Sequence, residues 1–331
     1  GGFAAEDLRE LAPRPHGLST ALKRVEVRQA GAMDDDELLA AIAPTPQALV
    51  IVNSRAHALA LFRQAFEAGL DGVLHLTTRQ YAAHRRSLLR TVRDRLATGL
   101  PCRLIATSLV EAGVDLDFPT VWRAEAGLDQ IAQAAGRCNR EGRRPVEQSI
   151  VTIFRPADFK PPREIAQLAA DFGRVAPRHE DPLCLEAIRD YFDEVYWRKG
   201  ARLDAEGVLG AFTVDASGTA FAYRTVAERF RLIDSGLAPV IVARDALAMQ
   251  ALAALSSPEA RAGRIARQLQ PFIVQVPPKA RALLWKNGHV HFAEERRFGD
   301  QFAVLTAEGL YGDQGLLWED ADYLGLESPI I

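Results

Sequence analysis

Cysteines and long hydrophobic runs are scarce in this sequence of 331 residues. No stretch of about 18 apolar residues occurs, so the sequence offers no membrane-spanning helix. The three cysteines, Cys102, Cys138 and Cys184, are widely spaced and odd in number, which argues against a disulfide scaffold and against a zinc site. Such cysteine usage fits a reducing compartment, so we expect a cytoplasmic protein that has no contact with membranes.

A charge excess of either sign is also missing. Lys and Arg number 40 against 43 Asp and Glu, which gives a formal net charge of −3. A strongly basic body, which would indicate nucleic-acid binding by composition alone, is therefore absent. The hydrophobic content of 48% is sufficient for ordinary buried cores. At roughly 100–200 residues per domain, the length predicts two domains.

The sequence lacks the phosphate-binding loop G-x-x-x-x-G-K-[ST]. None of its lysines follows a glycine; they are Lys23, Lys160, Lys199, Lys279 and Lys286. Without this loop nothing cradles the β- and γ-phosphates of a nucleotide. No acidic box follows a buried strand to hold Mg²⁺, and no His-Asp pair of a metal nuclease occurs. We expect Asp34–Glu37 to cap a helix instead.

No metal site is predicted elsewhere. His289 and His291 alternate along an expected strand and share one face, but no third ligand stands at a typical spacing.

Short apolar stretches alternate with helical patterns in the first half of the chain. The expected strands are 23–28, 48–53, 72–76, 103–107, 120–123 and 149–154. Leu49–Val52 and Leu104–Ala106 are continuous apolar runs, as expected for strands buried on both faces. Helices are expected at about 54–69 and 80–97. This alternation predicts an α/β fold with a parallel sheet flanked by helices.

The second half of the chain has a different pattern of expected helices and strands. Helical patterns occur at 163–173 and 182–199, and from about residue 218 strand-like runs surround two helices. These strands are expected at 240–243, 272–276, 289–292 and 302–305, and the helices at 244–255 and 258–269. We therefore expect a smaller α+β domain here. The predicted parts are an irregular linker at 1–20, an α/β domain at 21–157, a helical linker at 158–217 and an accessory C-terminal domain at 218–331.

The strongest functional signal is Gln133–Arg140, of sequence QAAGRCNR. The preceding residues indicate a helix, which we expect to continue through this segment. Gln133, Arg137 and Arg140 then share one helical face at i, i+4 and i+7. Two arginines on a rigid face suit the charge of a transferring phosphoryl group. Gly136 inside a helix costs about 1 kcal/mol relative to Ala, which close approach of a ligand would explain. A solvated helix edge is the alternative.

A second signal is Ala106–Asp115, of sequence ATSLVEAGVD, which begins at the end of a buried strand. Parallel α/β folds place their ligand loops at such ends. Thr107 and Ser108 offer hydroxyls and amides suited to phosphate oxygens. Gly113 permits a turn, and Asp115 can accept a hydrogen bond from a ribose hydroxyl. An ordinary strand–turn–helix connection is the alternative.

The order of these segments adds to their specificity. Ala106–Asp115 precedes Gln133–Arg140 with one strand between them, which is the order of motifs V and VI in superfamily 2 nucleic-acid helicases. Val50–Ser54 resembles their motif IV, and His75–Arg79 resembles the next conserved block. Four blocks in the right order are far more specific than any one of them.

In their detailed form, motifs V and VI resemble those of the type I CRISPR interference helicase–nuclease, the "Cas three" family. Phe221–Ile233 resembles the segment that joins that family's motor to its C-terminal domain, and Tyr311–Leu316 resembles the end of that domain. The resemblance is strongest over 48–142. It implies a second RecA-like lobe, then linker helices and a C-terminal domain, and it implies a first lobe that this sequence lacks.

The resemblance also implies roles for single residues. Facing the ATP phosphates would be Gln133, Arg137 and Arg140, with Arg140 as the arginine finger. Nucleotide contacts are further implied for Asp115, Gly113 and Gly136, where Asp115 would contact the ribose or support motif VI. Contacts to the phosphates of single-stranded DNA are implied for Thr107, Ser108, Ser54, Thr77 and Arg79.

The cofactor implied is ATP with Mg²⁺, shared with the missing first lobe, and none is expected to bind this chain alone. The implied partners are single-stranded DNA, the CRISPR surveillance complex (Cascade) and the protein's own N-terminal lobe and nuclease domain. The whole protein would unwind and degrade target DNA in antiviral defence, whereas this chain alone would be catalytically inactive. Two alternatives stay open: a fragment of another superfamily 2 helicase, and a non-catalytic protein-binding scaffold.

Overall fold

The computed structural model describes residues 6, 9–214, 217–218, 221–230 and 236–320. The chain forms two compact units. Unit 1 comprises Gly1–Leu74 and Arg95–Val195, and unit 2 comprises His75–Asp94 and Tyr196–Ile331. The ends of two expected segments, 231–233 of the motor-joining segment and 321–331 of the C-terminal domain, lie outside the described residues, as does most of 1–8.

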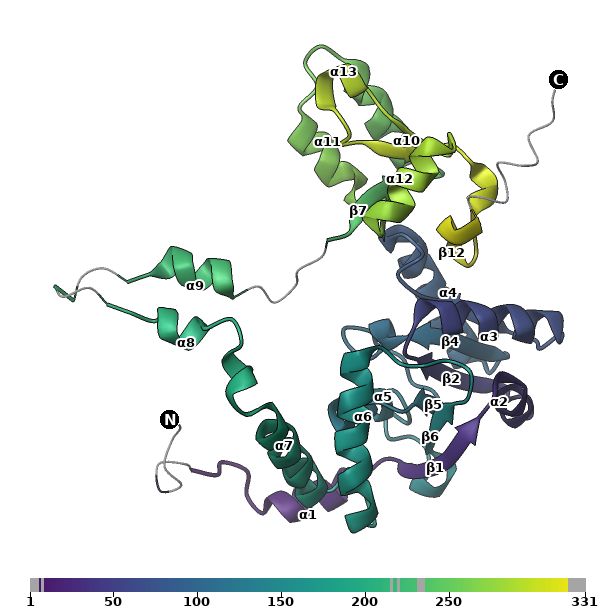
Figure 1. Cartoon of the computed structure of the whole chain (residues 1–331). Helices are drawn as coiled ribbons and strands as arrows, with labels where there is room; N and C mark the ends of the chain where they lie inside the picture. Colours follow the sequence, from purple (N-terminus) through teal and green to yellow (C-terminus); the bar gives the residue numbers. More distant parts are fainter. Residues whose placement is uncertain (1–5, 7–8, 215–216, 219–220, 231–235, 321–331) are drawn as a thin grey trace. The chain divides into compact units, whose positions relative to one another are not determined.

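Unit 1 is built on a six-stranded sheet with the order β1-β6-β5-β2-β4-β3 (Figure 1). Its strands are β1 (Glu26–Met33), β2 (Gln47–Val52), β3 (Val73–Leu76), β4 (Cys102–Thr107), β5 (Thr120–Ala124) and β6 (Ile150–Pro156). The pairs β1–β6, β6–β5, β5–β2 and β2–β4 are all parallel. The predicted α/β fold with a RecA-like parallel sheet is confirmed.

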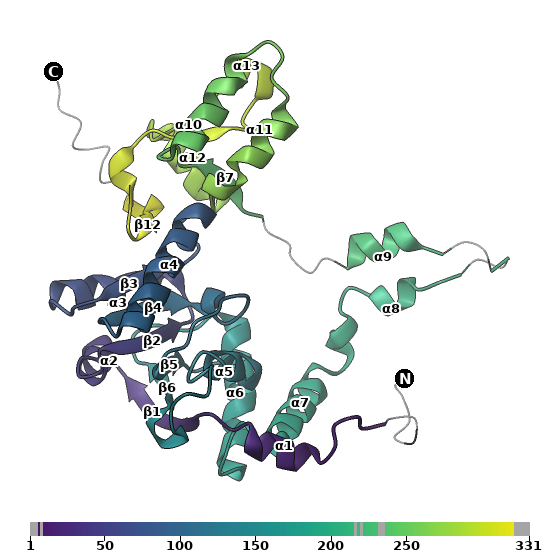
Figure 2. The same cartoon turned by 180° about the vertical axis from the view of Figure 1, so that it is seen from behind.

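Helices cover both faces of this sheet (Figures 1 and 2). The helices up to residue 199 are α1 (Pro15–Ala21), α2 (Asp35–Ile42), α3 (Arg55–Glu67), α4 (Ala82–Thr98), α5 (Leu128–Ala135), α6 (Arg163–Val175) and α7 (Leu185–Lys199). One face packs against α2 and α3, and the other packs against α5, α6 and the first part of α7. α4 and α7 each continue from one unit into the other.

The centre of the sheet explains the continuous apolar runs. All six residues of β2 are buried, and Leu49 pairs in register with Leu104 of β4. Side chains of a strand alternate between faces, so a strand with a helix layer on each side is apolar at every position. Val50 and Val52 therefore contact the α2–α3 layer, whereas Ile153 of β6 contacts the α5–α6 layer.

Two local expectations near the N-terminus have different outcomes. Asp34 caps α2: its carboxylate accepts from the Glu37 amide at 2.8 Å, and the Glu37 carboxylate accepts from the Asp34 amide at 3.0 Å. This capping box confirms the prediction for Asp34–Glu37. The expected irregular linker, in contrast, contains α1, which starts with Pro15 at the first helical position, where proline is well tolerated.

Unit 2 contains a four-stranded sheet of order β8-β7-β10-β9 and a small hairpin. The strands are β7 (Ala238–Ile241), β8 (Ile273–Val276), β9 (Val290–Phe292), β10 (Ala303–Leu305), β11 (Tyr311–Gly312) and β12 (Gly315–Leu316). The helices are α8 (Val208–Ala211), α9 (Tyr223–Arg229), α10 (Ala246–Ala253), α11 (Ala262–Leu269), α12 (Pro278–Lys286) and α13 (Glu295–Phe298). One core cluster lies between the sheet and α10–α11, and a second includes α12 and the hairpin. The α+β arrangement predicted for this part of the chain is present.

Residues 75–94 belong to unit 2, although they lie in the sequence between two strands of unit 1. Tyr81 packs against both core clusters of unit 2 and stacks on Tyr311 at 5.2 Å between ring centroids. The predicted division at 21–157, 158–217 and 218–331 concerns domain identity and stays a prediction. The compact units do not follow this division. Residues 75–94, which lie within the predicted α/β domain, cluster in unit 2, and residues 158–195, which lie within the predicted linker, cluster in unit 1.

Within the described part of the chain, every helix is too short or too polar to cross a lipid bilayer.

Gly315 tests the packing of the β11–β12 hairpin. Its φ is +86°, and a Cβ at this position would lie 2.4 Å from the carbonyl oxygen of Arg79. We expect Gly315→Ala to destabilise unit 2 by about 2 kcal/mol or more, because both the left-handed backbone and the close contact are then strained. Gly312→Ala is the matched control in the same hairpin, since a Cβ there meets nothing within 4 Å. Urea unfolding of both variants measures the difference, and equal stability would contradict this account.

Candidate functional site

The carboxyl ends of three neighbouring strands bring the first site residues together. β2 pairs with β4 on one side and with β5 on the other. Asn53 follows β2, the 3-10 helix η2 (Ser108–Val110) follows β4, and Arg123 is the penultimate residue of β5. Ligands of open α/β sheets bind at this edge, which makes it the place to look for nucleotide contacts.

Arg123 and Glu111 form an ion pair inside this edge. Nε of Arg123 lies 2.7 Å from Oε1 of Glu111, and the two side chains are 0% and 3% exposed. Nη1 of Arg123 also donates to Oδ1 of Asn53 at 2.7 Å and to the carbonyl oxygen of Ala124 at 2.8 Å. Nδ2 of Asn53 in turn donates to the carbonyl oxygen of Glu125 at 2.8 Å. One buried guanidinium therefore joins the ends of β2 and β5 to the segment after β4.

Burial acts on both members of this pair. Desolvation raises the pKa of Glu111, and the nearby positive charge of Arg123 opposes that rise. Desolvation also lowers the pKa of Arg123, and the charge of Glu111 opposes that fall. Because a guanidinium stays protonated in proteins, each group stabilises the charged form of the other. Removal of either partner would leave the other charge buried and uncompensated, which is strongly destabilising.

The helix expected through residues 133–140 ends early. α5 covers Leu128–Ala135, and Gly136 is its C-cap. The prediction that Gln133, Arg137 and Arg140 share one helical face is therefore wrong. Gln133 is exposed on the last turn of α5, whereas both arginines lie in the loop that follows.

A bridge to the segment that precedes β5 explains why the helix stops. Phe118 and Cys138 form an isolated parallel bridge, in which the Phe118 amide donates to the Arg137 carbonyl and the Asn139 amide donates to the Phe118 carbonyl, each at 2.9 Å. Gly136 is a poor helix former, so the chain leaves the helix there at little cost. Gly136 therefore serves as the C-cap of α5, and contact of this exposed residue with a nucleotide stays a prediction.

Arg137 points into the protein rather than toward a solvent-filled cleft. The residue is 8% exposed. Its Nε donates to the carbonyl oxygen of Val110 at 2.9 Å, and its Nη2 donates to the carbonyl oxygen of Glu111 at 2.6 Å. Arg137 thus fastens the motif VI loop to the motif V segment. Direct contact of Arg137 with ATP phosphates stays a prediction to which this position lends no support.

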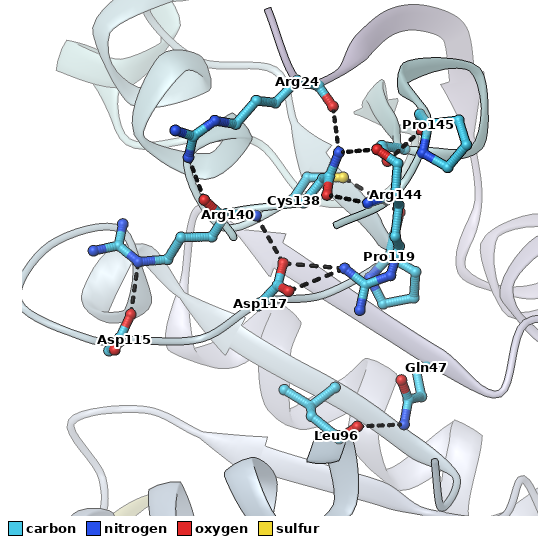
Figure 3. Close-up of polar contacts among 12 residues, drawn as sticks. Arg24, Gln47, Leu96, Asp115, Asp117, Pro119, Cys138, Arg140, Arg144 and Pro145 are labelled. Carbon is cyan, nitrogen blue, oxygen red and sulfur yellow. Dashed lines mark hydrogen bonds and ion pairs between the residues drawn. The ribbon is translucent and has the colours of Figure 1, made fainter. Parts of the chain in front are cut away.

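Arg140 and Arg143 are both exposed in this loop. The side chain of Arg140 lies beside that of Asp115, and its backbone lies beside Asp117 (Figure 3). Nε of Arg140 lies 2.6 Å from Oδ1 of Asp115, and the two side chains are 42% and 71% exposed. The Arg140 amide donates to Oδ1 of Asp117 at 2.7 Å. Gly113, with φ of +70°, forms the turn that precedes Asp115. Of the two roles expected for Asp115, the structure displays support of motif VI; contact with a ribose is untested.

Asn139 fixes the path of the loop, and sequence reasoning missed it. Its φ is +47°, which is uncommon for a residue other than glycine but accessible to asparagine. Nδ2 donates to the carbonyl oxygens of Arg24 at 3.0 Å and Arg144 at 2.7 Å, and Oδ1 accepts from the Arg144 amide at 3.0 Å. Nη1 of Arg144 also contacts both carboxylate oxygens of Asp117 at 3.1 Å (Figure 3). The available signal was an asparagine shortly after a helix-ending glycine, because asparagine tolerates positive φ.

Three of the residues predicted to touch DNA lie in unit 1. Ser108 is exposed and Thr107 is half-buried, both at the end of β4. Ser54 caps α3, and its Oγ accepts from the His57 amide at 3.1 Å. Ser54 therefore has a structural function independent of any ligand, and the DNA contacts of all three residues stay predictions.

The other two, Thr77 and Arg79, are buried in unit 2 and are 0% and 2% exposed. The Arg79 guanidinium makes two hydrogen bonds of 2.7 Å to the carboxylate of Glu319 and lies 4.3 Å from the ring centroid of Trp318. Oγ1 of Thr77 accepts from the Arg79 amide at 3.2 Å. In this arrangement neither side chain can reach a DNA phosphate, which corrects the expectation. A block that resembles a DNA-contacting motif here serves to pack unit 2.

His75 lies at the start of the same block and is 2% exposed. Burial, together with the positive charge of Arg79, lowers the pKa of His75 to about 3. The side chain is therefore neutral in the folded protein across the physiological pH range.

No cluster of three or more His, Cys, Asp or Glu side chains that could hold a metal ion occurs among the residues that the structure describes.

Comparisons with known proteins agree with the resemblance seen in the motifs. Residues 45–143 match the family model described as the C-terminal part of the CRISPR-associated nuclease/helicase Cas3. A CRISPR-associated nuclease/helicase Cas3 from Haloferax volcanii is 40% identical over 98 residues, which are 28% of this chain and 10% of that protein. The resemblance to the C-terminal part of this family is confirmed for the segment that carries motifs IV to VI.

Solved structures extend the similarity of fold to most of the chain. T. fusca Cas3 is similar with a TM-score of 0.62 at 18% identity, over 93% of this chain and 42% of that one. A chain of a CRISPR RNA-guided surveillance complex in a pre-nicking state has a TM-score of 0.57 at 18% identity, over 86% and 41%. The chain thus spans about a tenth of the curated relative and about two fifths of the solved ones.

The Arg123–Glu111 pair can be tested by removing one partner and then both. We expect Arg123→Met to lower the free energy of unfolding by about 3–5 kcal/mol, because Glu111 is left buried without a counter-charge. Adding Glu111→Leu should recover much of that loss, since an apolar pair requires no desolvation of charge. Urea unfolding measures both, and Arg143→Met, an exposed position in the loop after α5, is the control with an effect within about 0.5 kcal/mol. A double variant no more stable than the single one would refute the pairing.

His75 predicts a pH dependence of stability. Its pKa is about 3 in the folded protein and 6.5 without burial, so below pH 6.5 only the unfolded chain takes up a proton at this residue. Stability contributed by neutral His75 is complete above pH 6.5 and falls by about 1.4 kcal/mol per pH unit as the pH drops toward 3. Between pH 7.5 and 5.5 the wild type should therefore lose about 1.4 kcal/mol more than His75→Gln. Identical pH profiles of unfolding in the two proteins would contradict this assignment.

Proposed function

We propose that this chain is the C-terminal part of an ATP-dependent, single-stranded-DNA translocase and nuclease that unwinds and degrades target DNA in CRISPR antiviral defence. Unit 1 would be the second RecA-like lobe of the motor. The family match over residues 45–143 and the fold similarity to T. fusca Cas3 support this proposal. Because the chain spans only part of those relatives, ATP hydrolysis and DNA cleavage are proposed for the whole protein and not for the chain alone.

One observation carries the proposal: the motif VI loop presents the accessible guanidinium of Arg140, held by a carboxylate of the motif V segment. Arg140 is held at Nε by Asp115, yet its side chain stays 42% exposed. A guanidinium at an otherwise fixed position is what an arginine finger requires, because it stabilises charge that develops on a transferring phosphoryl group. The donor set of Arg140 therefore fits a nucleotide γ-phosphate presented by a facing lobe.

The buried residues of the site would act through Arg140. Arg137 ties the motif VI loop to the carbonyls of Val110 and Glu111, and Arg123 ties Glu111 to the sheet. The loop and the sheet edge would therefore move as one body when the two lobes close. ATP with Mg²⁺, bound mainly by the first lobe, would supply the phosphoryl group. Positioning of a charged group within about an ångström is worth large factors in rate.

DNA contacts of this lobe would come from the exposed end of β4. Ser108 and Thr107 offer hydroxyl groups and amides there. Such groups bind the phosphate backbone and carry no base specificity, as a translocase requires. Thr77 and Arg79 are no longer part of this proposal. A surveillance complex of the kind named for one structural relative would be the partner that delivers the DNA.

The two alternatives differ in what they predict. A fragment of another superfamily 2 helicase would share the ATPase but not the coupling to a CRISPR surveillance complex, and the family match favours the CRISPR assignment. A protein-binding scaffold would need no accessible arginine at motif VI. Arg140 is exposed and is paired with Asp115, and this arrangement favours a motor over a scaffold.

The motor proposal is tested with Arg140→Ala in the full-length protein. We expect the kcat for DNA-stimulated ATP hydrolysis to fall by about 10³-fold, because an arginine finger stabilises the transition state far more than the ground state. Arg143→Ala, which removes an exposed arginine from the same loop, is the control and should retain activity near the wild type. Arg137→Ala should instead destabilise unit 1 in urea unfolding.

The outcomes separate the alternatives. No ATPase in the wild-type full-length protein leaves only the scaffold. ATPase that is unaffected by Arg140→Ala refutes the finger assignment. ATPase that depends on Arg140 but is not stimulated by a DNA-bound surveillance complex points to a different helicase.

A further inference from the structure

Unit 1 contains a cysteine, a histidine and a carboxylate in a row, in the segment 179–190 that leads into α7. Sγ of Cys184 lies 3.9 Å from Nδ1 of His179. Nε2 of the same ring lies 2.9 Å from Oδ2 of Asp190. His179 is largely buried, with 15% of its side chain exposed, and Asp190 is 41% exposed. Cys184 itself is partly buried and carries no disulfide.

The carboxylate fixes which nitrogen of His179 carries the proton. A carboxylate oxygen only accepts hydrogen bonds, so Nε2 of His179 donates to Asp190. In the neutral ring the lone pair is then on Nδ1, the nitrogen that faces Cys184. His179 is therefore oriented to accept the thiol proton, which is the arrangement that activates a sulfur nucleophile.

Cys184 also sits at the start of a long helix. It directly precedes α7, which has 15 residues, and its sulfur accepts from the Ala187 amide at 3.4 Å. Backbone amides at a helix N-terminus stabilise negative charge. A thiolate at this position would thus receive a hydrogen bond from the amide on one side and from protonated His179 on the other.

A pocket of about 590 Å³ opens beside this thiol. Cys184 lines it, together with three cations and one carboxylate: Lys23, Arg24, Arg140 and Asp181. Lys23 pairs with Asp181 at 2.8 Å and Arg140 pairs with Asp115 at 2.6 Å, so Arg24 supplies the remaining positive charge of the wall. The volume lies within the range of small-molecule sites, about 300–1,000 Å³. The pocket therefore fits a small anionic molecule placed against the sulfur.

We propose that Cys184 is a reactive thiol that forms mixed disulfides with small anionic disulfides bound in this pocket. His179 takes the proton of Cys184, and the thiolate attacks one sulfur of the incoming disulfide. A new bond forms between Cys184 Sγ and that sulfur, and the disulfide bond of the reagent breaks. The second half of the reagent leaves as a thiolate with the electron pair of that bond.

Glu186 modulates this reaction. The hydrogen bond from its own backbone amide is the main cause that lowers the pKa of Glu186, and a smaller contribution comes from a hydrogen bond with Cys184. Its negative charge opposes formation of a thiolate nearby. We therefore expect Glu186→Gln to accelerate the modification of Cys184.

The other two cysteines are internal controls, and Cys138 is the stricter one because it also lines the pocket. Cys102 and Cys138 are 0% and 1% exposed. Burial raises the pKa of Cys102 to about 11 and that of Cys138 to about 12. Both should stay unmodified in the folded chain and become reactive only on unfolding.

The test uses 5,5′-dithiobis(2-nitrobenzoate), a dianionic disulfide whose leaving group is followed by absorbance. In the folded chain we expect one thiol to react, identified as Cys184 by mass spectrometry, at a rate about tenfold or more above that of the same cysteine in urea. His179→Gln should bring the rate down to the unfolded value, whereas His289→Gln in unit 2 should leave it unchanged. If partial burial were the only effect, Cys184 would react more slowly in the folded chain than in urea. A faster reaction in the folded chain therefore supports the proposal, and a slower one contradicts it.

Folding of the variant is checked in the same experiment. If Cys102 or Cys138 reacts in His179→Gln, the variant has opened, and Asp190→Asn replaces it with the same expected loss of rate. A Cys184 that reacts no faster in the folded chain than in urea, or that is indifferent to both substitutions, overturns the proposal.

The preference for anions is tested with 4,4′-dithiodipyridine, a neutral disulfide. The ratio of folded to unfolded rate should be higher for the dianionic reagent, and Arg24→Gln should reduce that ratio for the dianion only. Equal ratios would refute the role of the cationic wall. None of these measurements depends on ATP hydrolysis, so their outcome is independent of the proposed motor function.

Discussion

The buried ion pair between Arg123 and Glu111 is the constraint around which the site is arranged. Both charges have left water, and each is tolerable only because the other lies 2.7 Å away. Arg123 is fixed by the sheet, so Glu111 and the segment after β4 must return to the sheet edge to meet it. Arg137 then reaches the backbone of that same segment. The position of the motif VI loop therefore follows from a requirement for charge compensation in the layer beneath it.

Three arginines of unit 1 show how burial assigns different functions to one residue type. Arg123 is fully enclosed and compensates a carboxylate, and Arg137 is nearly enclosed and satisfies two carbonyl groups. Arg140 alone keeps its side chain substantially in solvent. Only the last can change partner without a large desolvation cost, because its charge is already hydrated. The distinction rests on surroundings, which the residue type does not reveal.

Much of the architecture could be predicted from the sequence. The apolar runs at Leu49–Val52 and Leu104–Ala106 located buried parallel strands, since a strand between two helix layers has no polar face. The helix through motif VI was predicted wrongly, because a bridge between Phe118 and Cys138 overrides local helical preference. Likewise, Thr77 and Arg79 were assigned to DNA from a motif, while their burial depends on residues far away in the chain. Contacts between distant segments leave no periodic signal, so these positions required the structure.

The contact of Arg79 with Glu319 joins residues that are 240 positions apart in the chain. At roughly 5–20 residues per second of synthesis, the ribosome would need about 10–50 s to make the acidic partner after the arginine has been added. By then the strands of unit 1, the last of which ends at Pro156, are already complete. Residues 75–94 must therefore wait, with Tyr81 and Arg79 lacking the surfaces that later bury them. Contacts of such long sequence separation form slowly, so residues 75–94 are expected to reach their native packing later than the strands of unit 1.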